Sequence, residues 1–210
     1  MRHDRHEQIV KCSRDITSES KKIIFLLHRY SGKKTDEEKR EILEEAKERL
    51  NEVRSSLLLK VAKAMSCVMD QYMHNSAITF GIQEHIEASA FFKFISTGQL
   101  LMYDEMKELF TFAENDPDGD LKEYSLEITP LDYLLGLSDV GGELMRYATN
   151  QYSAGDISTA ENVVDFMRVI YRGYLLHHSQ HRDFTQKTVI FRQSLMKVLF
   201  YFGDVLQLSI

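Results

Sequence analysis

Hydrophobic residues recur every three or four positions along most of the chain, which is the period of an amphipathic helix. The first such stripe predicts a helix over about residues 3–30 and consists of Ile9, Cys12, Ile16, Ile23, Leu26, Leu27 and Tyr30. The polar segment SGKKTD then interrupts the pattern, and Thr35 or Asp36 within it is able to cap a second helix. The stripe of that second helix consists of Leu43, Ala46, Leu50, Val53, Leu57, Val61, Ala64 and Val68.

The same period predicts further helices over about residues 70–96, 129–152, 159–177 and 184–208, with a short helix near 103–112. The helix near 129 begins at Thr129 or Asp132, and the polar stretch at about 114–128 is expected to form a loop. Only 2 prolines interrupt the 210 residues. The sequence therefore predicts an all-α fold, a single-domain bundle of about six or seven helices over residues 1–210.

The stretch FGIQEHIEASAFFKFI at 80–95 places two glutamates on a face that otherwise looks like core. At 100° per residue, an arc of about 120° contains Phe80, Glu84, Glu87, Ala88, Phe91, Phe94 and Ile95. Burying two carboxylates side by side costs several kcal/mol per ion unless a cation or another partner compensates them. The alternative is that this arc only borders the core, and that the glutamates reach solvent or meet arginines.

A second acidic stripe lies on PLDYLLGLSDVGGELMRY, where Asp132, Asp139 and Glu143 fall within about 40° of one another. Taken alone, this pattern is typical of an amphipathic helix with its charged side in solvent. Taken with Glu84 and Glu87, it can close a metal site. Arg146 is a candidate contact for phosphate, with a salt bridge to Glu143 as its alternative use.

Composition excludes several other functions. The formal net charge of −6 gives the chain no basic surface for holding nucleic acid unaided. The longest apolar runs, such as IIFLL, are far shorter than the ~20 residues that span a bilayer, so no membrane partner is expected. A zinc site at His177, His178 and His181 lacks a further ligand. A di-iron bundle requires Glu-x-x-His pairs, and no histidine here has a glutamate three residues before it.

Three segments resemble the catalytic, translin-associated branch of the translin family: SRDITSESKKIIFLLHR at 13–29, GIQEHIEASAFFKFI at 81–95 and TPLDYLLGLSDVGGELMR at 129–146. GDI at 155 and QSLMKV at 193 extend the resemblance over nearly the whole chain. The resemblance implies a translin-like helical bundle that assembles with translin into a closed hetero-oligomeric shell. It also implies an endoribonuclease that activates the RNA-silencing complex by degrading the passenger strand, with a further link to processing of transfer-RNA fragments.

Carried over by position, the acidic cluster of the family falls on Glu84, Glu87 and Asp139, with Glu143 as a fourth candidate ligand. Oxygen ligands without histidine or thiolate suit Mg²⁺, with Mn²⁺ as an alternative. We expect Glu87 and Asp139 to bind the ion directly and Glu84 to serve as ligand or base, with single-stranded RNA as the substrate. The rival hypothesis is a non-catalytic helical partner that stabilises translin and regulates its RNA or DNA binding.

The expected location is the cytoplasm, with the nucleus as an additional location. The family's basic N-terminal tract has no counterpart in this sequence, which therefore does not decide nuclear import.

Overall fold

The computed structural model describes residues 2–65, 68–115, 119–177 and 181–203. Its helices are α1 (Arg2–His28), α2 (Asp36–Glu52), α3 (Leu59–Ala64), α4 (Val68–Thr97), α5 (Tyr103–Leu109), α6 (Pro130–Ser153), α7 (Ile157–Leu176) and α8 (Arg182–Tyr201). A 3-10 turn, Arg29–Gly32, follows α1, and a π-helical turn, Val53–Leu58, joins α2 to α3 in one continuous rod. The predicted all-α bundle is confirmed, and the predicted end of the last helix, near Leu208, lies outside the described residues.

Local chemistry explains where two of the helices begin. The Thr35 side chain accepts a hydrogen bond from the Glu38 backbone N–H, and the Glu38 side chain accepts one from the Thr35 backbone N–H, which makes a capping box for α2. At α6, the Thr129 hydroxyl accepts from the Asp132 backbone N–H, and Pro130 occupies the first helical position. Both predicted caps are therefore present.

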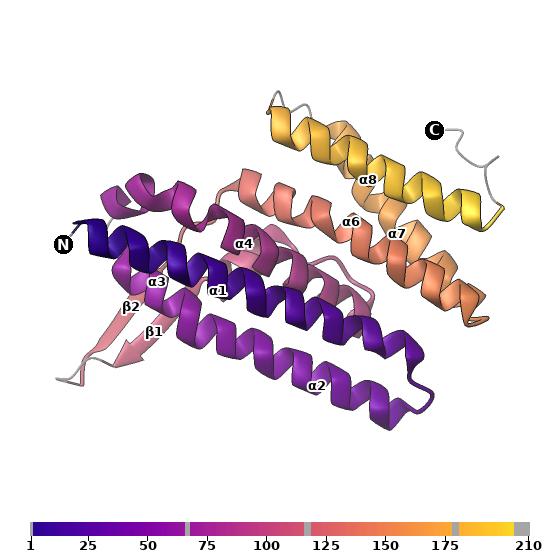
Figure 1. Cartoon of the computed structure of the whole chain (residues 1–210), viewed down its shortest axis with the longest axis horizontal. Coiled ribbons are helices and arrows are strands. Elements are labelled where there is room, and N and C mark those ends of the chain that lie inside the picture. The colour runs from indigo at the N-terminus through magenta and orange to yellow at the C-terminus, as the bar shows by residue number, and fades with distance from the viewer. Residues whose placement is uncertain (1, 66–67, 116–118, 178–180, 204–210) are drawn as a thin grey trace.

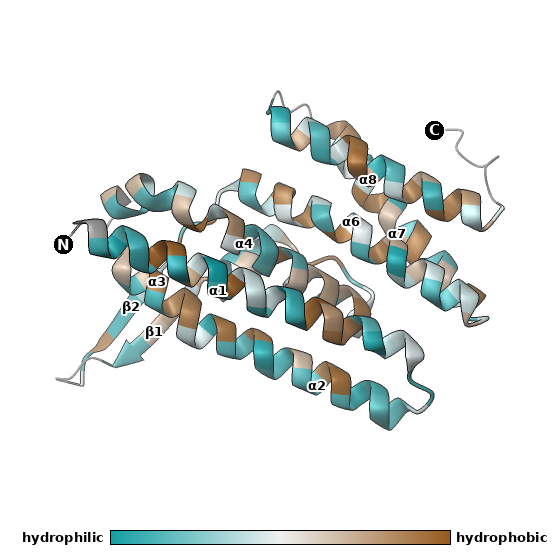
Figure 2. Cartoon of the chain, viewed as in Figure 1, coloured by the Kyte–Doolittle hydropathy of each residue, from teal (hydrophilic) through white to brown (hydrophobic). Residues whose placement is uncertain are grey.

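The helices pack in sequence across the bundle rather than around one axis. The long helix α1 lies against α2 on one side and α4 on the other, α4 in turn lies against α6, and α7 and α8 cover the far side of α6 (Figure 1). Hydrophobic and hydrophilic residues alternate turn by turn along these helices (Figure 2), and the hydrophobic ones form one continuous core. The central pair, α4 and α6, therefore packs against helices on both sides.

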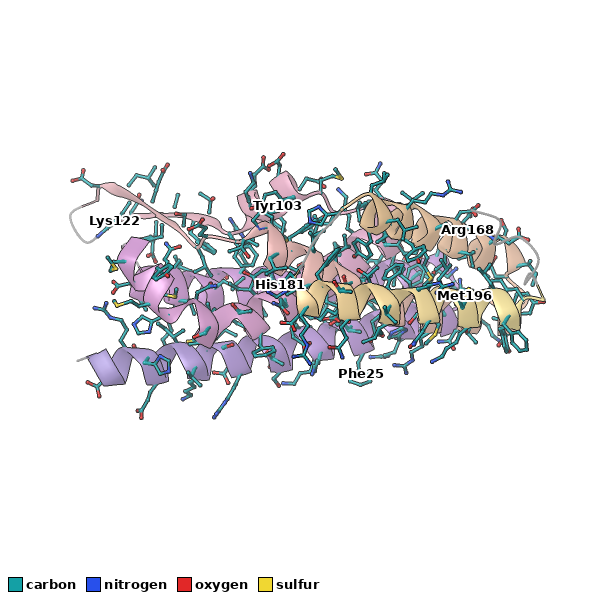
Figure 3. The ribbon with its side chains drawn as sticks, turned by 90° about the horizontal axis from the view of Figure 1, so that it is seen from above. Phe25, Tyr103, Lys122, Arg168, His181 and Met196 are labelled. Atoms are coloured by element: carbon teal, nitrogen blue, oxygen red, sulfur yellow. The ribbon has the colours of Figure 1, made fainter. Side chains whose placement is uncertain are left out.

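The predicted polar loop at about 114–128 is partly wrong. Strands β1 (Thr111–Asn115) and β2 (Leu121–Ser125) pair as an antiparallel hairpin that extends from one end of the bundle (Figures 1 and 3). The short helix before it ends at Leu109 rather than near residue 112. The Arg54 guanidinium fixes this junction, because it donates hydrogen bonds to the backbone carbonyls of Leu109 and Thr111, each at 2.7 Å.

Within the described residues, none of the helices is both long enough and apolar enough to cross a membrane.

Candidate metal centre

The two acidic faces lie on α4 and α6, which approach each other closely at Gly136. A Cβ atom at this position would lie 2.7 Å from the Gln83 carbonyl oxygen and 2.8 Å from the Ile86 Cβ, so only glycine fits without displacement. Asp139 follows Gly136 by almost one turn of α6, and Glu87 follows Ile86 on α4. The close approach of the two backbones therefore sets the separation of the two acidic faces.

The four candidate carboxylates line one cleft. This cleft has a volume of about 530 Å³ and is formed by α1, α4 and α6; its lining residues are Lys21, Ile24, Phe25, Glu84, Glu87, Asp139, Glu143 and Arg146. The five residues expected at this site thus lie on its wall: Glu84, Glu87, Asp139, Glu143 and Arg146. The side chains are not arranged as a ligand set, because no group of three or more His, Cys, Asp or Glu residues in the described ranges could hold a metal ion as it stands.

Basic side chains occupy the oxygens of three of these carboxylates. The Lys21 Nζ atom lies 3.2 Å from Glu84 Oε1, and the Lys187 Nζ atom lies 2.5 Å from Asp139 Oδ2. The His28 Nε2 atom lies 2.5 Å from Glu143 Oε2. Cations and an imidazole from α1 and α8 therefore balance part of the negative charge of the cleft.

The sequence interpretation missed these partners. Lys187 comes from α8, is 48 residues from Asp139 and also donates to the Leu135 carbonyl. His28 is 115 residues from Glu143, and its ring lies 5.0 Å from that of Phe91. A signal for part of this wall existed, since the segment 13–29 that carries the family resemblance contains both Lys21 and His28.

Glu87 is the most perturbed group of the cleft. Only 9% of its surface is exposed. Burial, together with the neighbouring carboxylates of Asp139, Glu84 and Glu143, raises the pKa of its carboxyl group to about 8, although Lys187 opposes the shift. On the same helix, the Oε2 atom of Glu84 is buried without a hydrogen-bond partner. The cleft therefore contains a carboxyl group that holds a proton near neutrality and a free buried oxygen.

Two side chains lie elsewhere than the sequence pattern suggested. Asp132 is buried outside the cleft, where Oδ1 accepts a hydrogen bond from Gln83 at 3.0 Å and Oδ2 accepts one from Thr129 at 2.6 Å. Phe80 is 74% exposed instead of joining the aromatic face of α4. Arg146 is exposed and lies over the Phe25 ring, 6.0 Å from its centroid, while Glu143 pairs with His28.

The alternative zinc cluster falls partly outside the described residues, since His178 is not among them. Of its other members, His177 lies with its ring edge against Phe184, with 5.5 Å between the ring centroids.

The fold and the cleft together define an all-helical protein with a carboxylate-rich site between its two central helices. A family model described as the translin family matches residues 4–199. Translin-associated protein X of Rattus norvegicus is 39% identical, over 94% of this chain and 71% of the relative. The homologue from Schizosaccharomyces pombe is 27% identical, over 93% of this chain and 78% of the relative. The chain therefore belongs to the translin family.

Solved structures agree on the fold. The crystal structure of apo-NeC3PO covers 95% of this chain and 88% of its own with a TM-score of 0.73 and 18% identity. The structure of an AfC3PO complex with duplex RNA covers 99% of this chain and 93% of its own, with a TM-score of 0.70 and 24% identity. At these identities the likeness concerns the helical architecture alone.

Proposed function

We propose that this chain is the catalytic subunit of a Mg²⁺-dependent endoribonuclease that acts within a hetero-oligomer with translin. The observation that carries the proposal is the cleft itself, where four carboxylates from two helices face one another and Glu87 is almost fully buried. Such an arrangement is costly to maintain, and perturbed carboxyl groups of this kind are typical of functional sites. The similarity to translin-associated protein X supports the partner.

The residues present fit a hard divalent cation. All donors of the proposed site are carboxylate oxygens, and the buried, unpartnered Oε2 atom of Glu84 is available without breaking a contact. Glu84, Glu87 and Asp139 would hold Mg²⁺ or Mn²⁺, with Glu143 as a fourth ligand. When bound, the ion would polarise the scissile phosphate and lower the pKa of a bound water.

The chain's own groups would manage charge and protons. Lys21 and Lys187 would have to release Glu84 and Asp139, after which their ammonium groups are free to approach the phosphate. A carboxylate of the cleft that is not fully engaged as a ligand would take the proton from the attacking water. Glu84 is our candidate for this base because one of its oxygens is unpartnered.

The proposed substrate is single-stranded RNA, including the passenger strand whose removal activates the RNA-silencing complex, and transfer-RNA fragments. Because the net charge is −6, we expect the translin subunits to provide most of the phosphate-binding surface. The proposed locations are the cytoplasm and the nucleus. One structural neighbour is described in complex with duplex RNA, so tests of strandedness need a blunt duplex beside the single strand.

A second candidate function is that of a non-catalytic partner that stabilises translin and regulates its RNA or DNA binding. The ion pairs of the cleft favour it, since Glu84, Asp139 and Glu143 each have a basic partner and no described group could hold a metal as it stands. In that case the cleft is a partly exposed network of ion pairs that needs no metal.

Cleavage assays on the assembled complex distinguish the two functions. We expect Glu84→Gln, Glu87→Gln and Asp139→Asn each to lower the Mg²⁺-dependent cleavage of single-stranded RNA at least about 100-fold, because each removes a ligand or base. Exposed Glu44→Gln on α2 is the matched control and should cleave like the parent. Sizing of every complex confirms assembly. Parental rates in all three cleft variants would establish the non-catalytic function instead.

A further inference from the structure

Phe25 is a large aromatic side chain that lies in solvent although its neighbours on α1 form the core. Its exposed fraction is 62%, whereas Ile24 and Leu26 are buried at 6% and 5%. Figure 3 shows its side chain pointing outward from the ribbon. A single exposed aromatic residue is ordinary on a protein surface, but this one lies on the wall of the carboxylate cleft.

The position of Phe25 on α1 places it between two contacts to the carboxylates. Lys21, which contacts Glu84, precedes it by four residues, and His28, which contacts Glu143, follows it by three. Residues at these spacings lie on one helix face. Phe25 therefore lies on the wall of the cleft, between the residues of α1 that contact the carboxylates of α4 and of α6.

Arg146 extends this wall from α6. Its guanidinium lies 6.0 Å from the centroid of the Phe25 ring, and both side chains are exposed. The guanidinium lies over one face of the ring, which leaves the other face for a base. The pair matches the two parts of a nucleotide, since a base stacks on an aromatic face and the phosphate accepts from the guanidinium. Most of the other polar residues on the walls of the cleft are acidic.

We infer that Phe25, with Arg146 over one face of its ring, is a stacking platform for one unpaired base of the RNA, next to the carboxylate cleft. This inference rests on the proposed function. A base inside a duplex is covered by its neighbours on both faces and cannot reach the ring without unstacking. The platform would therefore position a single strand and exclude a blunt duplex. Phe25 is a positioning residue, because it holds a base away from the reacting phosphate.

The test compares Phe25→Leu, which keeps an apolar side chain but removes the aromatic face, with Phe25→Trp, which keeps the face. Phe200→Leu is the matched control, because Phe200 is 76% exposed and lies 13 residues beyond Lys187 on α8, about 20 Å along the helix. In the complex with translin, we expect Phe25→Leu to raise KM for single-stranded RNA about 5- to 10-fold with kcat unchanged. Phe25→Trp and Phe200→Leu should retain the parental KM.

A set of RNAs with one abasic position each identifies the stacked base. When the missing base is the one that stacks on Phe25, the parent should show a higher KM for the abasic RNA than for the intact RNA. Phe25→Leu should show the same KM for both RNAs. A parental KM in Phe25→Leu overturns the inference. So does loss of translin from the Phe25→Leu complex in sizing experiments, which would place Phe25 in a subunit interface.

Failure of the proposed function gives a different result. If the parental complex shows no Mg²⁺-dependent cleavage, the catalytic proposal fails while the platform is still tested by binding. Fluorescence anisotropy with a labelled single-stranded RNA should then show that Phe25→Leu raises the Kd for this RNA about 5- to 10-fold. Equal binding by the parent and Phe25→Leu overturns the platform.

Discussion

Replacing Glu87 by glutamine should stabilise the metal-free protein, and the gain should depend on pH. In the unfolded chain the carboxyl group of Glu87 has its ordinary pKa of 4.5, and burial beside Asp139 and Glu84 raises the pKa to about 8 in the folded protein. Between these values the folded state holds a proton that the unfolded state has lost. The stability contributed by this proton is fully present below pH 4.5 and disappears as the pH rises through 8.

The magnitude follows from the same two pKa values. Each pH unit between them lowers the free energy of unfolding by about 1.4 kcal/mol. The accumulated loss is about 3 kcal/mol at pH 7 and about 5 kcal/mol above pH 9, as order-of-magnitude figures. Glutamine has nearly the same shape and never ionises, so Glu87→Gln escapes this loss. For a chain of 210 residues, a gain of about 3 kcal/mol corresponds to roughly 6–12 °C in Tm.

The assay is thermal unfolding of the assembled complex in chelator, at pH 5, 7 and 9, for the parent, Glu87→Gln and the exposed control Glu44→Gln. The Tm difference between Glu87→Gln and the parent should be small at pH 5 and grow toward pH 9. Addition of Mg²⁺ should raise the Tm of the parent more than that of Glu87→Gln, because bound metal offsets the ionisation cost. A difference that does not change with pH, or a lower Tm for Glu87→Gln at pH 9, would refute the reasoning.

Two further predictions concern the framework of the site and its assembly. Gly136→Ala should lower stability by about 1–3 kcal/mol and slow cleavage, since its Cβ would lie 2.7 Å from the Gln83 carbonyl oxygen. Gly142→Ala, whose Cβ would have no atom within 4 Å, should be neutral or stabilising by up to about 1 kcal/mol. Chemical denaturation of both variants measures these changes in the free energy of unfolding. The chain should form a defined hetero-oligomer with translin in sizing and light scattering, and a stable monomer that cleaves RNA at the full rate would contradict this expectation.

Periodicity predicted most of the fold because long helices are specified locally. It failed where distant contacts decide the structure. Phe112, read as the end of a helix, is buried in β1 and faces Tyr124 of β2 across the hairpin. The Arg54 guanidinium lies over its ring at 5.2 Å. The sequence of this short polar segment indicates neither the pairing of β1 with β2 nor the contact with Arg54, which lies 58 residues before Phe112.

The second hydrophobic stripe also contained a change of phase that regular helical spacing does not anticipate. The stripe placed Val53 and then Leu57 in the core, but the structure buries Val53 and Leu58 and leaves Leu57 half-buried. Val53 and Leu58 are five positions apart, which is the i to i+5 spacing of the π-helical turn Val53–Leu58. The extra residue in this turn shifts the buried face of α3 by one position relative to α2.

For the site, the sequence specified which carboxylates share a helix face but not how their charge is balanced. The spacing of three residues between Glu84 and Glu87 is local, whereas the partners of the cluster come from α1 and α8 and depend on tertiary packing. Three of the four carboxylates form an ion pair with a basic side chain, whereas none of the ion pairs found among the described residues includes Glu87. Burial beside the other three carboxylates raises the pKa of Glu87, so that a retained proton there takes the place of a cation. A divalent ion in the cleft would replace this proton and the two lysines together. The proposed metal binding, the pH dependence of stability and the release of Lys21 and Lys187 therefore all report the same exchange of positive charge in the cleft.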